Sequence, residues 1–129
     1  MVGIAAPADI IGANLSATQG LTNTPSGYNV DVHIIRINAA GTIQNSDHHS
    51  SALEVMTDFD GAGTAGAVAL DAGGQTALAT WLKDNWVEND FVFIGLQSDT
   101  LIPSGNGTEG LTYNGVELSV TTVPEPSSA

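Results

Sequence analysis

The stretch VELSVTTV, residues 116–123, is the clearest strand signal in the chain and sets the expectation for the fold. Apolar side chains at positions 116, 118 and 120 alternate with polar ones at 117, 119 and 121. A period of two is typical of a β-strand that buries one face and exposes the other. We therefore expect a sheet protein whose last strand runs to Val123.

Upstream of this stretch, six further segments have strand-like patterns. In the most informative one, residues 28–37, the apolar positions are even-numbered up to Ile34, and Ile35 and Ile37 then reverse the phase. A reversal of this kind predicts a β-bulge or a crossing between two sheets. Residues 91–96 are apolar at almost every position, which predicts a strand covered on both faces. The six predicted strands are 12–18, 28–37, 42–43, 53–57, 67–70 and 91–96.

Helical periodicity occurs in one segment, where Leu78, Trp81 and Leu82 follow the i, i+3, i+4 spacing of an apolar helix face. Glycines at 73 and 74 precede this segment, and Asn89-Asp90 follows it, so the predicted helix covers about residues 75–85. Turn signals recur at intervals of roughly 8–12 residues. The expected fold is an all-β, jelly-roll-type β-sandwich of about seven strands with one short helix, formed as a single domain by residues 1–122.

The composition excludes several classes of partner. The 129 residues include 14 Asp or Glu and only two basic side chains, Arg36 and Lys83, which gives a formal net charge of -12. A nucleic-acid-binding surface needs many more cations, and an anionic membrane surface would repel this chain. No segment has the length and apolar character of a membrane span. Cysteine is absent, which excludes disulfides, zinc ribbons and thiol nucleophiles.

The sequence lacks the motifs of several large enzyme classes. It contains no Gly-x-Ser-x-Gly elbow, no phosphate-binding loop and no His-Glu-x-x-His helix. Glycosidases need two carboxylates at a fixed separation, and 14 scattered acids do not single out such a pair. We therefore expect a non-catalytic protein, with a fragment of a secreted glycan-active enzyme as an alternative.

Asp58 and Asp60 are the candidate calcium ligands. They lie two residues apart at the mouth of a glycine-rich loop, and Ca²⁺ prefers oxygen ligands of this kind. The remaining positions of an EF-hand are not met, so solvated loop carboxylates are the simpler interpretation. Calcium is the one cofactor that the sequence suggests.

The three histidines do not form a metal motif in the sequence. His48 and His49 are adjacent, and on an extended chain they would point to opposite sides, so an exposed polar loop that includes Asp47 is expected. His33 is expected on the solvent face of its strand.

Trp86 and Tyr113 are the candidate carbohydrate-binding residues, because aromatic rings stack on sugars in lectin-like jelly rolls. Trp86 falls just past the predicted helix and is expected to be exposed. Trp81 belongs to the apolar helix face and is expected in the core. A carbohydrate-binding module is therefore a second alternative.

The sequence VPEPSS, residues 123–128, follows the last predicted strand directly. In this it resembles the PEP-CTERM proteins. These proteins are exported by Gram-negative bacteria that make extracellular polysaccharide. The resemblance implies that Val123, Pro124, Glu125 and Pro126 open a sorting signal processed by an exosortase. In that family a membrane-spanning helix and an arginine cluster complete the signal, and neither follows within residues 123–129.

A second, looser resemblance covers the body of the chain. The run LDAGGQTALATW, residues 70–81, followed by FVFIGL, residues 91–96, is similar to jelly-roll modules of the DNRLRE type. In those modules an earlier Phe-Asp-Leu strand precedes a strand like Ala13-Asn14-Leu15. The resemblance implies that the domain lacks its first strand or strands and that the sorting signal is truncated. A sandwich without these strands has an unpaired edge, so self-association is expected.

Together these features predict a non-catalytic, exported protein at the cell surface or in the extracellular matrix of a Gram-negative bacterium. The expected role is structural or adhesive and linked to exopolysaccharide and biofilm. The expected partners are the exosortase-type sorting machinery and extracellular polysaccharide.

Overall fold

The computed structural model describes residues 7–22, 30–59, 65–98 and 110–123. Within these residues the chain forms six strands, one α-helix and two 3₁₀ helices. Their order is η1 (Pro7–Asp9), β1 (Ile10–Thr22), β2 (Val30–Asn38), η2 (Asn45–His49), β3 (Leu53–Met56), β4 (Gly66–Ala69), α1 (Ala72–Asn85), β5 (Phe91–Ser98) and β6 (Gly110–Thr122).

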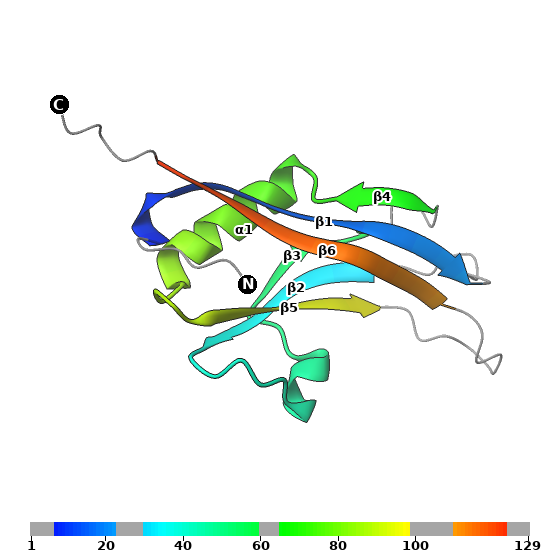
Figure 1. Cartoon of the computed structure of the whole chain (residues 1–129), viewed down its shortest axis with the longest axis horizontal. Coiled ribbons are helices and arrows are strands. Elements are labelled where there is room, and N and C mark those ends of the chain that lie inside the picture. The colour runs from blue at the N-terminus through cyan, green and yellow to red at the C-terminus, as the bar shows by residue number, and fades with distance from the viewer. Residues whose placement is uncertain (1–6, 23–29, 60–64, 99–109, 124–129) are drawn as a thin grey trace.

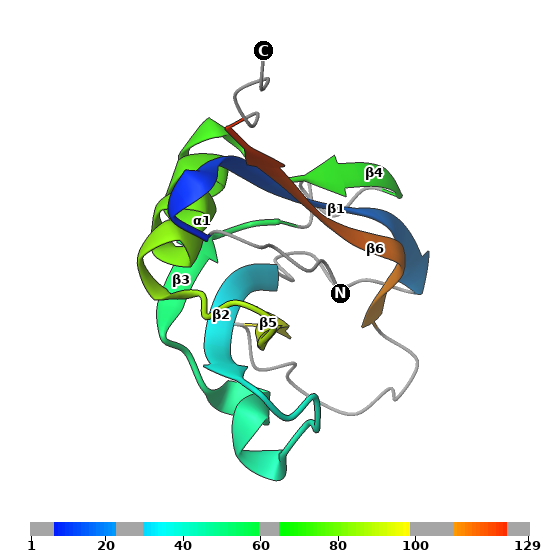
Figure 2. The same cartoon turned by 60° about the vertical axis from the view of Figure 1, so that its left-hand side comes forward.

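The strands form two three-stranded antiparallel sheets, in the orders β4-β1-β6 and β3-β2-β5. The pairing is nested, since β1 pairs with β6 and β2 pairs with β5. Figure 2 shows the two sheets one above the other, with α1 along one side. The predicted all-β sandwich is thus confirmed, with six strands in the described residues where about seven were expected.

The core lies between the sheets and under α1. Alternate residues of β1 and β2 point into it, as the period of two requires. The helix contributes Leu78 and Leu82, both fully buried, and packs against β1 of one sheet and β3 of the other (Figure 1). The helix therefore closes one side of the sandwich. The buried core side chains are Ile10, Ala13, Leu15, Ala17, Val32, Ile34, Val55, Phe59, Val68, Leu70, Leu78, Leu82 and Trp86.

The helix begins at Ala72, three residues before the predicted start. Asp71 is its N-cap, and the side chain of Asp71 accepts a hydrogen bond of 2.7 Å from the backbone N–H of Gly74. A Cβ at Gly74 would lie 3.3 Å from the Cβ of Met56, so glycine lets this first turn pack closely against β3. The two glycines were interpreted as a boundary, but they form part of the helix.

The phase reversal predicted in residues 28–37 is confirmed. The pairing of β2 with β5 shifts register between Ile34 and Arg36, which is the position where Ile35 changes the face of the apolar residues. The prediction that residues 91–96 are covered on both faces also holds. Val92, Ile94 and Leu96 pack against the core, and on the other face the guanidinium of Arg36 lies 3.9 Å from the ring centre of Phe93.

Two sequence expectations about individual strands are wrong. Residues 42–43 form no strand, because the carbonyl of Thr42 accepts a hydrogen bond of 2.9 Å from Arg36 instead of pairing with another strand. Val116 was expected to point inward and is exposed. Next to it, Gly115 has a φ of 59°, and the register of β6 against β1 shifts there, so Val116 lies at a β-bulge.

β5 and β6 are edge strands in the described sheets. A hollow of about 650 Å³ lies between them, lined mainly by the apolar side chains of Val92, Ile94, Leu96, Val116 and Leu118. Among the described residues, no helix has both the length and the apolar character needed to cross a membrane.

Candidate functional site

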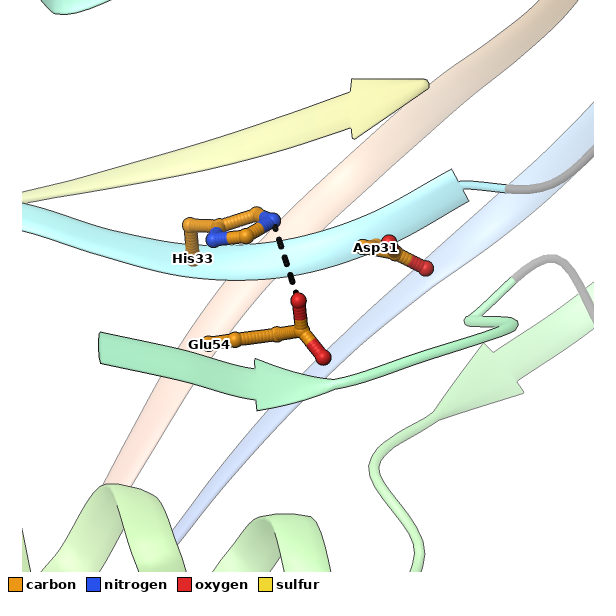
Figure 3. Close-up of side chains that lie close together, drawn as sticks. All are labelled: Asp31, His33 and Glu54. Carbon is orange, nitrogen blue, oxygen red and sulfur yellow. Dashed lines mark ion pairs between the residues drawn. The ribbon is translucent and has the colours of Figure 1, made fainter. Parts of the chain in front are cut away.

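Asp31, His33 and Glu54 come together on the outer face of the β3-β2-β5 sheet. Asp31 and His33 are two residues apart on β2 and so share a face, and Glu54 of β3 lies opposite His33 in the antiparallel register. One ligand atom from each of the three side chains lies within 4.8 Å of the others. Figure 3 shows the three side chains and the two strands that carry them. Over residues 7–22, 30–59, 65–98 and 110–123, this is the one cluster of three such side chains.

Each member of this cluster has a distinct environment. The side chain of His33 is 13% exposed and that of Glu54 is 51% exposed, with His33 Nε2 4.0 Å from Glu54 Oε2. On the other side of the imidazole, Nδ1 lies 2.7 Å from the hydroxyl oxygen of Ser51. Asp31 is 5% exposed, and its Oδ1 accepts a hydrogen bond of 3.2 Å from the backbone N–H of Asp58. Neighbouring groups thus hold His33 and Asp31, whereas Glu54 extends into solvent.

Two predictions concern residues in this region. His33 lies on the outer face of its strand as expected, but its side chain is only slightly exposed and contacts Ser51 and Glu54. Asp58, one of the two proposed calcium ligands, is exposed, and its backbone N–H binds Asp31. The other, Asp60, lies outside the described residues. Sequence reasoning therefore found the loop beside the cluster but missed the cluster itself.

Arg36 and Asp47 form a second polar group, nearer the end of β2. The guanidinium binds the carboxylate through two hydrogen bonds, of 2.7 Å from Nε and 2.9 Å from the terminal nitrogen. The backbone N–H of Gln44 donates a third to Asp47, at 2.8 Å. Asp47 is buried, so its expected exposure was wrong, and the side chains of His48 and His49 are outside the described part of the chain. This network fixes the connection between β2 and β3.

The Arg36–Asp47 pair predicts a specific pH dependence of stability. The hydrogen bond from Arg36, followed by that from Gln44, lowers the pKa of Asp47 from 3.8 to about 2. A carboxyl whose pKa is lower in the folded chain stabilises the fold above its unfolded pKa, and this contribution is lost as the pH falls. The difference in unfolding free energy between wild type and Asp47→Asn should therefore shrink as the pH falls from about 4 to about 2.

Urea unfolding at a series of pH values measures this difference. Asp84→Asn removes a carboxylate at an exposed position of α1, outside this network, and is the matched control. If the difference in unfolding free energy between wild type and Asp47→Asn stays constant down to pH 2, the lowered pKa of Asp47 is contradicted.

Of the two proposed sugar-binding aromatics, Trp86 is a core residue and Tyr113 packs against the core. Trp86 is 7% exposed, because the chain turns back after α1 and the indole Nε1 donates a hydrogen bond of 3.0 Å to the carbonyl of Asp90. Tyr113 is half-buried against the core, with its ring centre 5.9 Å from that of Phe59. The expected exposure of Trp86 is thus wrong, whereas Trp81 packs against the core as predicted.

The proposed sorting motif begins at the end of the described fold. The backbone N–H of Val123 donates a hydrogen bond of 2.8 Å to the carbonyl of Asp9, directly after β6 ends at Thr122. Pro124, Glu125 and Pro126 lie outside the described residues.

No protein-family model, curated protein or solved structure matches this chain.

Proposed function

We propose that this chain is a non-catalytic, exported β-sandwich module of the PEP-CTERM type. It acts at the cell surface or in the extracellular matrix of a Gram-negative bacterium. Its role there is structural or adhesive and linked to exopolysaccharide, and the exosortase-type machinery is its sorting partner.

The observation that carries this proposal is the position of Pro-Glu-Pro in the sequence relative to the fold. The hydrogen bond from Val123 to Asp9 ties the end of β6 to the start of β1, and Pro124 is the next residue. Neither Pro124 nor Pro126 has a backbone N–H, so these residues are poorly suited to extend a sheet. A sorting enzyme needs its recognition sequence next to a domain and not within one, and a tripeptide that follows the last strand meets this requirement.

The composition is compatible with a surface role. With a net charge of -12, the module repels other anionic surfaces at neutral pH, and this keeps it soluble. The carbohydrate-binding alternative needed Trp86 and Tyr113 on one exposed face. Trp86 is buried in the core and Tyr113 is half-buried against it, so they do not form an exposed aromatic face and we do not propose direct sugar stacking by these residues.

The coding DNA on both sides of the reading frame tests this proposal. We expect downstream codons for an apolar helix and an arginine cluster, and upstream codons for a signal peptide and a Phe-Asp-Leu strand. In-frame stop codons on both sides would contradict the proposal, because the tripeptide would then have no sorting signal to open.

A further inference from the structure

We propose that Asp31, His33 and Glu54 bind a divalent transition-metal ion, with Zn²⁺ as the best match to the donor atoms. The site lies on the outer face of the β3-β2-β5 sheet (Figure 3) and supplies one imidazole nitrogen and two carboxylates. This inference goes beyond the proposed function and does not depend on it, because it rests on side-chain geometry alone.

The three donor atoms lie within 4.8 Å of one another and must approach further to bind one ion. His33 Nε2 and Glu54 Oε2 are 4.0 Å apart, which is too long for a hydrogen bond. Two donors bound to a tetrahedral Zn²⁺ at about 2.0–2.2 Å lie roughly 3.4 Å apart. Rotation of Glu54, whose side chain is half exposed, closes this gap without moving either strand.

The second ring nitrogen of His33 is already engaged outside the cluster. Metal-binding histidines almost always donate the N–H of their other nitrogen to a nearby acceptor, which fixes the tautomer and the ring orientation. The hydroxyl of Ser51 lies 2.7 Å from Nδ1 and is such an acceptor. In the tautomer that donates from Nδ1, the lone pair of Nε2 is available on the side of Glu54. Ser51 is thus a positioning residue in this proposal.

The remaining ligand, Asp31, is held by the fold. Its carboxylate is almost fully buried, and Oδ1 accepts the backbone N–H of Asp58. The hydrogen bonds of Asp31 and His33 give these two ligands a defined direction before an ion binds. The side-chain conformational entropy lost on binding is therefore mainly that of Glu54. Three protein ligands also leave a coordination position for water.

The donor set favours a transition metal over calcium. Imidazole suits Zn²⁺, Cu²⁺, Fe²⁺ and Ni²⁺, whereas Ca²⁺ takes six to eight oxygen ligands. The cluster therefore differs in chemistry from the calcium site expected at Asp58 and Asp60. A chain with a net charge of -12 also attracts cations without specific sites, so the test must separate the cluster from this general attraction.

Titration calorimetry with Zn²⁺ in a buffer of moderate salt provides the test. We expect one saturable site per chain, an affinity at least about tenfold weaker in His33→Gln and in Glu54→Gln, and a smaller loss in Ser51→Ala. The matched control is the double variant His48→Gln with His49→Gln, which removes the other two histidines and should bind as the wild type does. Circular dichroism of each variant shows whether the fold is retained.

Cobalt(II) gives a second readout, which reports the coordination of the ion. Visible absorption bands of protein-bound Co²⁺ should appear with the wild type and the His48/His49 variant and be lost with His33→Gln. Three results would overturn the proposal: no saturable Zn²⁺ binding, equal binding by wild type and His33→Gln, or loss of binding only in the His48/His49 variant. Calcium binding that competes with Zn²⁺ and persists in His33→Gln would also overturn it.

Discussion

Replacing Phe59 with alanine is expected to lower the free energy of unfolding by about 3–5 kcal/mol. Phe59 follows β3 and is 1% exposed, and its backbone N–H donates a hydrogen bond of 2.8 Å to the carbonyl of Val30 in β2. Its ring faces Tyr113 of β6, which belongs to the other sheet. Phe59 therefore joins the two sheets, and its removal leaves a cavity between them. Since small domains have a total stability of about 5–15 kcal/mol, this loss is a large share.

Urea unfolding of wild type and Phe59→Ala, monitored by circular dichroism, measures this effect. We expect a lower midpoint of the transition and an unchanged dependence of the unfolding free energy on urea concentration. Phe59→Leu keeps most of the side-chain volume and should lose clearly less stability than Phe59→Ala. A loss below about 1 kcal/mol in Phe59→Ala would mean that the ring does not fill the space between the sheets.

Alanine at Ile10 is expected to cost about 2–5 kcal/mol, whereas alanine at the adjacent Ile11 should change stability by about 0.5 kcal/mol or less. Ile10 is 3% exposed and belongs to the core, and Ile11 is 61% exposed. Both are in β1, where a register shift against β6 lies between Ile10 and Gly12. The two variants make the same chemical change, so the difference between them reports burial alone.

The same urea experiment compares the two variants. Because neighbouring strand residues point to opposite faces, a register error of one residue would exchange the two effects. Equal losses, or a larger loss for Ile11→Ala, would contradict the described start of β1.

Local sequence patterns predicted most of the secondary structure. Period-two alternation identified β1 and β6, although both are longer than predicted, and the phase change at Ile35 located the bulge in β2. The helix was found from Leu78 and its neighbours because an amphipathic stripe depends only on residues within a few turns. Its start was missed, since glycine usually ends helices and the cap at Asp71 becomes visible only with the hydrogen bond to Gly74.

Features that depend on contacts between distant segments were not predictable in the same way. Asp31 and His33 are visibly two residues apart on a strand, but the position of Glu54 depends on the register of β2 against β3. The connection between β2 and β3 is held by the contact between Arg36 and Asp47. Because the sequence does not reveal this contact, it does not predict the register of the two strands. The burial of Trp86 likewise results from the turn after α1, and residue order gives no signal for it.

We propose that Pro-Glu-Pro, residues 124–126, directs the module to the cell surface. The most direct test expresses the complete reading frame in the bacterium that encodes it and separates inner membrane, outer membrane and medium. We expect the wild type and a Ser127→Ala, Ser128→Ala control to reach the cell surface or the medium. A Pro124→Ala, Glu125→Ala, Pro126→Ala variant should remain in the inner membrane. If this variant reaches the surface in wild-type amounts, the tripeptide is not a sorting signal and the proposed function is contradicted.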